Sequence, residues 1–512
     1  MNTISRIKKG FYFDSVTLMR VGRELSGLPG VSEASVVMAS DANKAILDMS
    51  KLLLPEIEKA SDQDLAIVVR AKDKKTAEEA MAKAEELLNN RKKPNGSACA
   101  TAPSPRDIAS AVEALPGANL ALISIAGRYA AREAQRALTA GLNVMLFSDN
   151  VSVEAEAALK KEAHRRGLIV MGPDCGTAII NGVPLAFANV VPRGPIGVVG
   201  ASGTGLQEVT CIIANEGSGI SQAIGTGGRD IKDAVGGISF LDAMEALAAD
   251  PETKVLLLVA KPPQPGVLKK IRALMRKVEK PVVALLLGEG GPPATLEQAA
   301  WMALAHAAGQ DPGEVAARLE QRDAALREEA RQIVAKRKQA TGRYLRGLFS
   351  GGTFCAEAQV VLHGVLRQIY SNAPLGDSKK LKNAWKPEKN ALVDLGEDEF
   401  TVGRAHPMID FTLRNKMLEE QAALPETAVL LLDVVLGYGA NPDPVAELAP
   451  VIRKAARKVF VVAGMTGTDG DPQNRNQVVE ALKAAGAHVK LTNAAASLLA
   501  GYIADEMAHK PR

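Results

Sequence analysis

The stretch Pro195-Ile-Gly-Val-Val-Gly-Ala-Ser-Gly-Thr-Gly-Leu-Gln-Glu208 joins a short apolar run, a cluster of small residues and the start of a helical pattern. These features predict a buried strand, a tight glycine turn and a helix in direct succession. The first N–H groups of such a helix have no partner inside it, so with the hydroxyls of Ser202 and Thr204 they can face a phosphate or a carboxylate. The other interpretation is a plain strand-to-helix turn in which Ser202 or Thr204 only caps the helix.

A second stretch, Leu348-Phe-Ser-Gly-Gly-Thr-Phe-Cys-Ala-Glu357, has similar small residues and again places a Glu four positions after a Thr. Downstream, Asp250-Pro-Glu-Thr-Lys-Val-Leu-Leu-Leu-Val259 resembles Leu424-Pro-Glu-Thr-Ala-Val-Leu-Leu-Leu-Asp433. Landmarks that recur in one order indicate a duplicated α/β unit. We therefore expect two parallel sheets in which the strands at Val255 and Val429 occupy the same place.

Each repeat would supply one anion-binding loop, which we call a cradle. The predicted phosphate-binding or anion-binding residues are Gly200, Ser202, Gly203 and Thr204 in the first cradle, and Gly351, Gly352 and Thr353 in the second.

The composition excludes several classes of protein. A length of 512 residues allows about three or four domains. The formal charge is only +4 and aromatic residues make up 4%, so we expect no binding to nucleic acid or membrane. The N-terminus lacks the apolar core of a signal peptide, so we expect a cytoplasmic protein. The four cysteines are scattered, which predicts reduced thiols and no metal site.

The chain divides by pattern into six segments of the α/β class. In the first segment we expect strands at Phe11–Phe13, Val31–Met38 and Leu65–Val69. The segments are a small α+β domain at 1–88, a polar linker with three prolines at 89–107, an open α/β domain at 108–192, an α/β unit at 193–320, a solvated helical connector at 321–345, and the repeat unit at 346–512.

Several strings resemble succinyl-CoA synthetase. The block from Met171-Gly-Pro-Asp-Cys-Gly176 to Gly225-Thr-Gly-Gly-Arg-Asp230 resembles its α subunit, and Leu432-Asp-Val-Val-Leu-Gly-Tyr-Gly439 resembles the carboxyl domain of its β subunit. By this resemblance, 108–192 is a Rossmann-like CoA-binding-type domain, 193–320 is an α-type ligase domain and 346–512 is a β-type ligase domain, the last two flavodoxin-like. The resemblance also implies a CoA-type loop made of Gly127, Arg128, Pro173 and Cys175. For Cys175, packing of a small residue is the alternative to a reactive thiol.

Longer strings resemble the FdrA family from end to end, among them Tyr12-Phe-Asp-Ser15, Asn143-Val-Met-Leu-Phe-Ser-Asp-Asn-Val-Ser152 and His406-Pro-Met-Ile-Asp410. That resemblance implies an acyl-CoA synthetase-like protein with partner subunits encoded nearby, a link to a carbamate kinase, and a role in oxamate carbamoyl transfer during allantoin breakdown. We accordingly expect an oligomer that takes a small-molecule substrate, with CoA or carbamoyl phosphate as substrate and no certain cofactor.

The departures from the ligase pattern bear on the chemistry. The ligase relays phosphate through a histidine in a Gly-His-Ala-Gly loop, where this chain has Gly288-Glu-Gly-Gly-Pro-Pro293. The glutamate that holds that histidine is also replaced, because the matching stretch reads Val259-Ala-Lys-Pro-Pro263. Anion binding would survive without a covalent phosphate carrier, so an acyl phosphate would be handled directly, by hydrogen-bond donors aimed at the phosphate and the carbonyl oxygen.

Three hypotheses follow. The first is a subunit of a carbamoyl- or acyl-phosphate transferase, in which Arg229, Arg404 or His406 orients the substrate carboxylate or polarises the carbonyl. For the two arginines the alternative is an interdomain salt bridge, and for His406 it is a structural hydrogen bond. The second hypothesis is a CoA ligase that borrows its nucleotide-binding domain and histidine from a partner. The third is a scaffold or ligand sensor without turnover.

Overall fold

The computed structural model describes residues 2–11, 13, 15–40, 43–44, 47–48, 50–90, 105–337, 341–401 and 405–509. The chain forms two compact units, one of residues 1–104 with 398–406, and one of residues 105–397 with 407–512. Among the described helices, none combines the length and the apolar character that a membrane span requires.

The N-terminal unit is built on a three-stranded antiparallel sheet in the order β1-β3-β2. The central strand β3 is an uninterrupted apolar run because both of its faces are covered: Leu65 and Ile67 belong to one core, Ala66 and Val68 to another. The elements are β1 (Asn2–Lys8), α1 (Ser15–Ser26), β2 (Val31–Met38), α3 (Pro55–Glu58), β3 (Leu65–Ala71), α4 (Lys74–Asn90) and, from later in the chain, α14 (Asp398–Thr401).

The expected strand at Phe11–Phe13 is wrong. The first strand is β1 at Asn2–Lys8, which pairs with β3 from Asn2 opposite Ala71 to Lys8 opposite Leu65. As an edge strand it is exposed or half-buried along its whole length, so its sequence carries little apolar signal.

The second unit begins with a parallel sheet in the order β4-β5-β6, as the open α/β pattern predicted. Its elements are α5 (Ile108–Ala114), β4 (Leu120–Ile123), α6 (Gly127–Thr139), β5 (Asn143–Leu146), α7 (Val153–Arg165) and β6 (Val170–Met171).

The unit that resembles the α-type ligase, which we call the first ligase domain, has a six-stranded sheet in the order β12-β11-β9-β10-β7-β8. In it β12, β11, β9 and β10 are parallel, and β7 pairs antiparallel with both β10 and β8. The elements are β7 (Thr177–Ile180), β8 (Val183–Ala186), β9 (Arg193–Ala201), α8 (Gly203–Asn215), β10 (Ile220–Gly225), α9 (Ile238–Ala249), β11 (Val255–Ala260), α10 (Pro265–Met275), β12 (Val282–Leu286) and α11 (Leu296–Ala307).

The second ligase domain has a seven-stranded, all-parallel sheet in the order β15-β14-β16-β13-β17-β18-β19. Counted from β13 along the five main strands, this is the flavodoxin-like order 2-1-3-4-5. The elements are β13 (Tyr344–Phe349), α13 (Gly352–Leu362), β14 (Tyr370–Ser371), β15 (Lys379–Lys380), β16 (Ala391–Asp394), α15 (Thr412–Ala423), β17 (Thr427–Val435), α16 (Pro444–Ala455), β18 (Phe460–Thr466), α17 (Arg475–Ala484), β19 (Ala487–Lys490) and α18 (Asn493–His509).

The strand register confirms the duplication. In the first ligase domain the order β10-β9-β11-β12 matches β16-β13-β17-β18 in the second. Val199 pairs with Leu258, three residues after Val255, and Leu348 pairs with Leu432, three residues after Val429. The strands at Val255 and Val429 therefore occupy the same place in their sheets, and Thr204 corresponds to Thr353.

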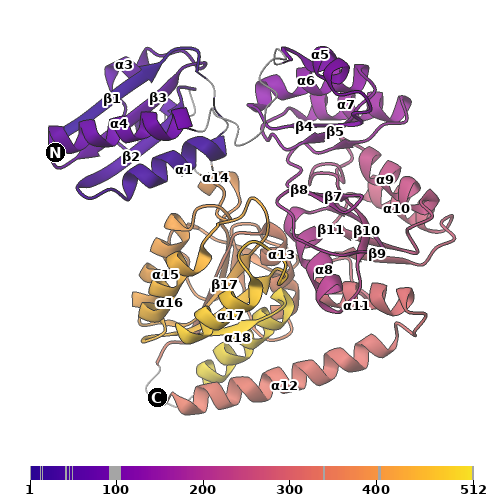
Figure 1. The fold of residues 1–512 in the computed structure, drawn as a ribbon. Coiled ribbons are helices and arrows are strands. Elements are labelled where there is room, and N and C mark those ends of the chain that lie inside the picture. The colour runs from indigo at the N-terminus through magenta and orange to yellow at the C-terminus, as the bar shows by residue number, and fades with distance from the viewer. Residues whose placement is uncertain are drawn as a thin grey trace. The chain divides into compact units, whose positions relative to one another are not determined.

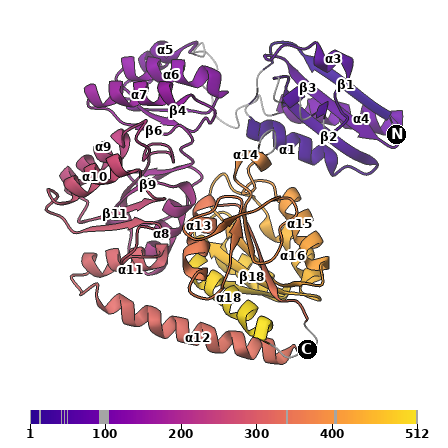
Figure 2. The same ribbon diagram turned by 180° about the vertical axis from the view of Figure 1, so that it is seen from behind.

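The predicted solvated connector is a helix with one buried face. Helix α12 runs over Glu314–Lys336 and packs against α18 and α11 (Figures 1 and 2). Leu326, Ala330 and Val334 recur at helical spacing and are buried. Because many charged residues lie between these apolar positions, the sequence suggested a solvated connector. That prediction is wrong for this face of the helix.

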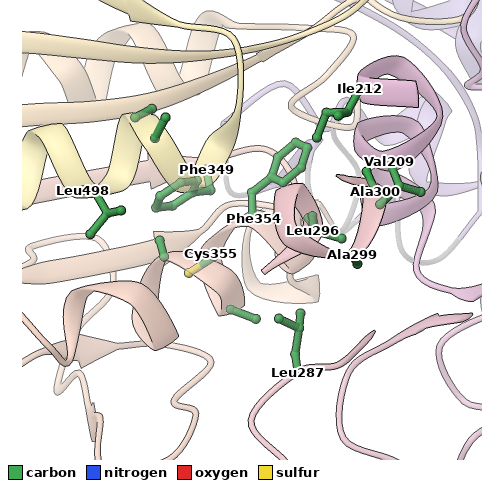
Figure 3. Packing of buried hydrophobic residues seen from close by; sticks show 14 of the residues in the cluster. Val209, Ile212, Leu287, Leu296, Ala299, Ala300, Phe349, Phe354, Cys355 and Leu498 are labelled. Carbon is green, nitrogen blue, oxygen red and sulfur yellow. The ribbon is translucent and has the colours of Figure 1, made fainter. Parts of the chain in front are cut away.

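One hydrophobic core runs through both ligase domains. Figure 3 shows Phe354 of α13 among Ile212 of α8 and Leu296 of α11, with Phe349 and Leu498 of the second domain nearby. Phe354 is completely buried. A core of this kind fixes the two domains against each other and so fixes the two cradles.

Candidate functional site

The two cradles meet in one place, where α8 and α13 begin. Both helices follow the corresponding strands β9 and β13 and lie side by side (Figures 1 and 2). Ser202 Oγ lies 2.6 Å from Thr353 Oγ1, and a Cβ atom added to Gly351 would lie 2.8 Å from Thr204 Oγ1. We call this place the helix junction and define it by Ser202, Gly203, Thr204, Gly351, Gly352 and Thr353.

The glycines of the junction are required for close packing and not for unusual backbone angles. The predicted tight turn is present, since only Ser202 lies between the end of β9 and the start of α8. Positive φ angles occur at other glycines but not at Gly200, Gly203, Gly351 or Gly352, so the turn does not need a left-handed residue. A Cβ atom at Gly200 would lie 2.7 Å from Leu206 Cγ, and one at Gly352 would lie 2.5 Å from Asp394 Oδ2. Gly203 is the exception, because an added Cβ atom would approach only Thr177, at 3.5 Å.

The two helices differ in how their first turns are capped. The N–H of Gly205 donates a 3.0 Å hydrogen bond to Ser202 Oγ, so α8 has a side-chain cap. Helix α13 begins at Gly352 without one. The turn before it is held by Asp433, whose carboxylate accepts from the N–H groups of Ser350 and Gly351 at 2.8 and 3.0 Å. The first amides of α13 are thus available to an anion.

Lys261 and Asp394 lie beside the start of α13. A Cβ atom at Gly352 would be 3.2 Å from Lys261 Nζ as well as 2.5 Å from Asp394 Oδ2. Asp394 is 2% exposed, and burial raises its pKa to about 6, although Lys261 acts to lower it. Sequence reasoning missed both residues. The available signal was that each directly ends or follows a parallel strand, where ligands of such sheets bind.

The glutamates of the repeat, Glu208 and Glu357, lie deeper in the core. Glu208 accepts from the N–H of Asn493 at 2.8 Å and from the hydroxyl of Thr466. Glu357 accepts from the N–H of Leu296 at 2.6 Å and from Asn493 Nδ2 at 2.7 Å. Burial raises the pKa of Glu208 to about 8 and that of Glu357 to about 7. Each glutamate binds the other domain's last helix or the residue that starts it.

Arg229, one of the three predicted catalytic residues, makes its contacts with the neighbouring domain. Arg229 Nε lies 3.0 Å from Glu156 Oε2, and its Nη2 donates to the carbonyl of Val151 at 2.8 Å. Both partners belong to the 105–192 domain, which corresponds to the interdomain alternative. His406 belongs to the compact unit of residues 1–104, and burial lowers its pKa to about 4, so it is neutral at pH 7. Arg404 lies outside the described residues.

Two residues of the predicted CoA-type loop, Gly127 and Cys175, pack closely against other segments of the chain. A Cβ atom at Gly127, the first residue of α6, would lie 2.1 Å from the carbonyl of Asp149, so only glycine fits. Cys175 donates a 3.3 Å hydrogen bond to the carbonyl of Gly225, and burial raises the pKa of its thiol to about 12. The thiol is therefore a packed group and not a nucleophile.

The other two residues of the predicted CoA-type loop are Pro173 and Arg128. The carbonyl of Pro173 faces Gly227. The Arg128 guanidinium lies over the Tyr129 ring at 4.9 Å.

The junction offers hydrogen-bond donors and one ammonium group rather than a covalent carrier. Its donors are backbone amides and one hydroxyl of the Ser202–Thr353 pair, since the other hydroxyl donates within the pair, with Lys261 nearby. The thiol of Cys355 in the same helix is buried with a raised pKa. Such a set can stabilise the developing charge of a departing phosphate without forming a bond to it.

Three family models match the chain. Residues 1–104 match one described as the AllF heavy metal-associated domain, residues 193–288 match a CoA-binding domain, and residues 348–503 match CoA-ligase. Residues 1–98 contain neither His nor Cys, and the described residues hold no group of His, Cys, Asp and Glu arranged for a metal ion. The CoA-binding match falls on the α-type ligase domain, and the assignment of 108–192 to CoA binding stays a prediction.

Known proteins similar to this chain include a relative of nearly full length. YahF of Escherichia coli K12, described as an uncharacterized protein, is 41% identical over 504 residues, covering 96% of this chain and 97% of YahF. The α subunit of the ADP-forming succinate–CoA ligase of Aquifex aeolicus is 30% identical over 183 residues, covering 35% of this chain and 59% of that subunit. An acetyl-coenzyme A synthetase 1 from Ca. Korarchaeum cryptofilum aligns over 81% of this chain and 89% of its own at 16% identity and a TM-score of 0.31, too low to support an argument.

Proposed function

Since the chain belongs to the same family as YahF, in the acyl-CoA synthetase and succinyl-CoA ligase-like superfamily, we propose that it is an FdrA-type subunit of a transferase. The enzyme would transfer a carbamoyl or acyl group from phosphate to a small carboxylate acceptor such as oxamate. The active complex would include partner subunits and would act in nitrogen or purine catabolism, with a carbamate kinase as a functional neighbour.

The observation that supports this proposal is the meeting of two helix starts at Ser202 and Thr353, 2.6 Å apart. In the reaction, the acceptor nitrogen attacks the carbonyl carbon, the bond from that carbon to the phosphate oxygen breaks, and inorganic phosphate leaves with the electron pair. Negative charge grows on the departing phosphate. Amides and hydroxyls fixed in a partly buried junction stabilise that charge without reorganising, which is the largest single contribution in many acyl-transfer enzymes.

The loop at 288–293 supports direct transfer. It reads Gly-Glu-Gly-Gly-Pro-Pro, and the nearest histidine along the chain, His306, lies in the last turn of α11. The reaction we propose needs no phosphohistidine, since the phosphate is already activated in the donor. Arg404 and His406 stay predictions for binding the acceptor carboxylate.

A CoA ligase that works with partner subunits is the second candidate. The match of residues 193–288 to a CoA-binding domain favours it, as does the CoA-ligase match of residues 348–503. CoA would then be a substrate and would accept the acyl group, while the nucleotide site would come from a partner.

Coexpression with the subunits encoded nearby separates these candidates. We expect the purified complex to release phosphate from carbamoyl phosphate only when oxamate or a similar acceptor is present, and without CoA. Release that requires CoA and yields a thioester would support the ligase. A complex that releases no phosphate under either condition would support a scaffold and would contradict the proposal.

A further inference from the structure

The two cradles are not equivalent, although the chain repeats them. Helix α8 is capped by Ser202, whereas α13 starts at Gly352 without a side-chain cap. Gly352 has no positive φ angle, so its backbone would accept any residue. What excludes a side chain is the space that Lys261 Nζ and Asp394 Oδ2 occupy beside it. The second cradle therefore has an uncapped helix start and two charged side chains at one point.

Lys261 supplies a positive charge at the start of α13, beside the Asp394 carboxylate. It follows β11 of the first ligase domain and reaches the first residue of α13 in the second. Within the described part of the chain, its ammonium has no hydrogen-bond or ion-pair partner. An ammonium beside an uncapped helix N-terminus attracts an anion from two directions.

Asp394 supplies a hydrogen-bond acceptor aimed at the same point. Its Oδ1 accepts from the N–H of Gly396 at 2.9 Å, but among the described residues nothing donates to Oδ2. Asp394 as a residue is only 2% exposed, so Oδ2 faces the start of α13 from within the protein. A ligand with an N–H or O–H group at this point would give Oδ2 a donor.

We propose that the second cradle is the ligand-binding half of the junction, and that Lys261 and Asp394 select a small phosphate or phosphonate that carries an N–H donor next to its carbonyl. Lys261 and the first amides of α13 bind the anionic group. Asp394 Oδ2 accepts from the N–H group and so distinguishes an amide or carbamoyl compound from its methyl analogue. This inference deepens the proposed function and rests on it for the choice of ligand.

Binding to the full-length chain, measured by calorimetry, tests the inference without any turnover. The probes are inorganic phosphate and two compounds of the same shape, phosphonoacetamide with an NH₂ group and 2-oxopropylphosphonate with a CH₃ group. We expect the unmodified protein to bind phosphonoacetamide roughly fivefold or more tightly than 2-oxopropylphosphonate, the worth of about one hydrogen bond. Lys261→Met should weaken all three probes by roughly tenfold or more, because it removes a charge-assisted contact.

The matched control is Lys269→Met, which removes an exposed lysine of α10 in the same domain and should leave all three affinities unchanged. Asp394→Asn keeps the side-chain shape and an acceptor for Gly396, and should erase the preference for the amide. Equal affinities of the two phosphonates for the unmodified protein, no binding of phosphate at all, or unchanged binding by Lys261→Met would each overturn the inference. If binding follows Lys261 but the complex transfers no carbamoyl group, the proposed function fails while the ligand site stands.

Discussion

Glu208 accepts a 2.8 Å hydrogen bond from the backbone N–H of Asn493, the first residue of α18 in the other ligase domain. The equivalent glutamate of the second domain makes the reciprocal contact: Glu357 accepts from the N–H of Leu296, the first residue of α11, at 2.6 Å. Each domain thus caps the last helix of the other. The reciprocal pattern is what a pseudo-two-fold pair requires, and it locks the two helix starts of the junction in place.

Removing one of these caps should destabilise the protein. Glu357→Ala would leave the buried N–H of Leu296 without this acceptor and would leave Asn493 Nδ2 with only the carbonyl of Phe354, at an expected cost of about 3 kcal/mol. Thermal unfolding measures the loss. Glu245→Ala, at an exposed position of α9, is the control and should change stability by less than about 0.5 kcal/mol. Equal midpoints for the two variants would show that the contact contributes nothing.

The same carboxyls should make stability depend on pH. Burial raises the pKa of Glu208 from 4.5 to about 8 and that of Glu357 from 4.5 to about 7, so between these values the folded state binds protons that the unfolded state has released. Their contribution to stability is complete below about pH 4.5 and is lost as the pH rises through 7 and 8. We expect the unfolding midpoint to fall between pH 5 and 8 relative to a Glu208→Gln, Glu357→Gln variant. Parallel curves would contradict the raised pKa values.

The buried thiols should resist alkylation. Burial raises the pKa of Cys175 to about 12, and it raises the pKa of both Cys211 and Cys355 as well. Because the thiolate is the reacting form, iodoacetamide at pH 8 should label none of the three in the folded protein and all three after denaturation. Mass spectrometry of the digested protein gives the answer for each site. Rapid labelling of Cys175 in the folded protein would show that its thiol is reactive and would contradict the prediction.

The protein should form no phosphohistidine. The position of the ligase histidine is taken by the loop at 288–293, which has none. We expect no acid-labile, base-stable label after incubation with radiolabelled ATP or acetyl phosphate, with a succinyl-CoA synthetase as the positive control. Stoichiometric label on any of the six histidines would favour the CoA-ligase candidate instead.

Much of the fold could be predicted because its signals are local. The apolar run at Val255–Ala260, the glycine loop before α8 and their repetition specify two sheets of the same order, as observed. Strand β1 escaped prediction because an edge strand keeps one side polar. Helix α12 was misjudged because its buried stripe is narrow and surrounded by charge.

The site could be predicted only in part. The repeat placed Ser202 and Thr353 in related loops, and the structure brings them into contact. Lys261 and Asp394 follow strands of two different sheets, and nothing in either local pattern says that they meet. Arg229 looked available in the sequence because its partner Glu156 belongs to another domain. Contacts between distant segments depend on how the domains pack. The spacing of residues within one motif carries no information about that packing.

The central claim is that a departing phosphate is bound where α13 begins, and Gly352→Ala tests it most directly. The added Cβ atom would lie 2.5 Å from Asp394 Oδ2 and 3.2 Å from Lys261 Nζ, so it would displace the two side chains that we propose to bind the ligand. Gly364→Ala, in the same domain, would approach only the carbonyl of Val361 at 3.8 Å. The measurement is phosphate release from carbamoyl phosphate and oxamate by the complex with its partner subunits, with thermal unfolding to show that both variants fold. We predict a loss of roughly a hundredfold or more for Gly352→Ala and an unchanged rate for Gly364→Ala. A folded Gly352→Ala complex that turned over at the unmodified rate would contradict the account.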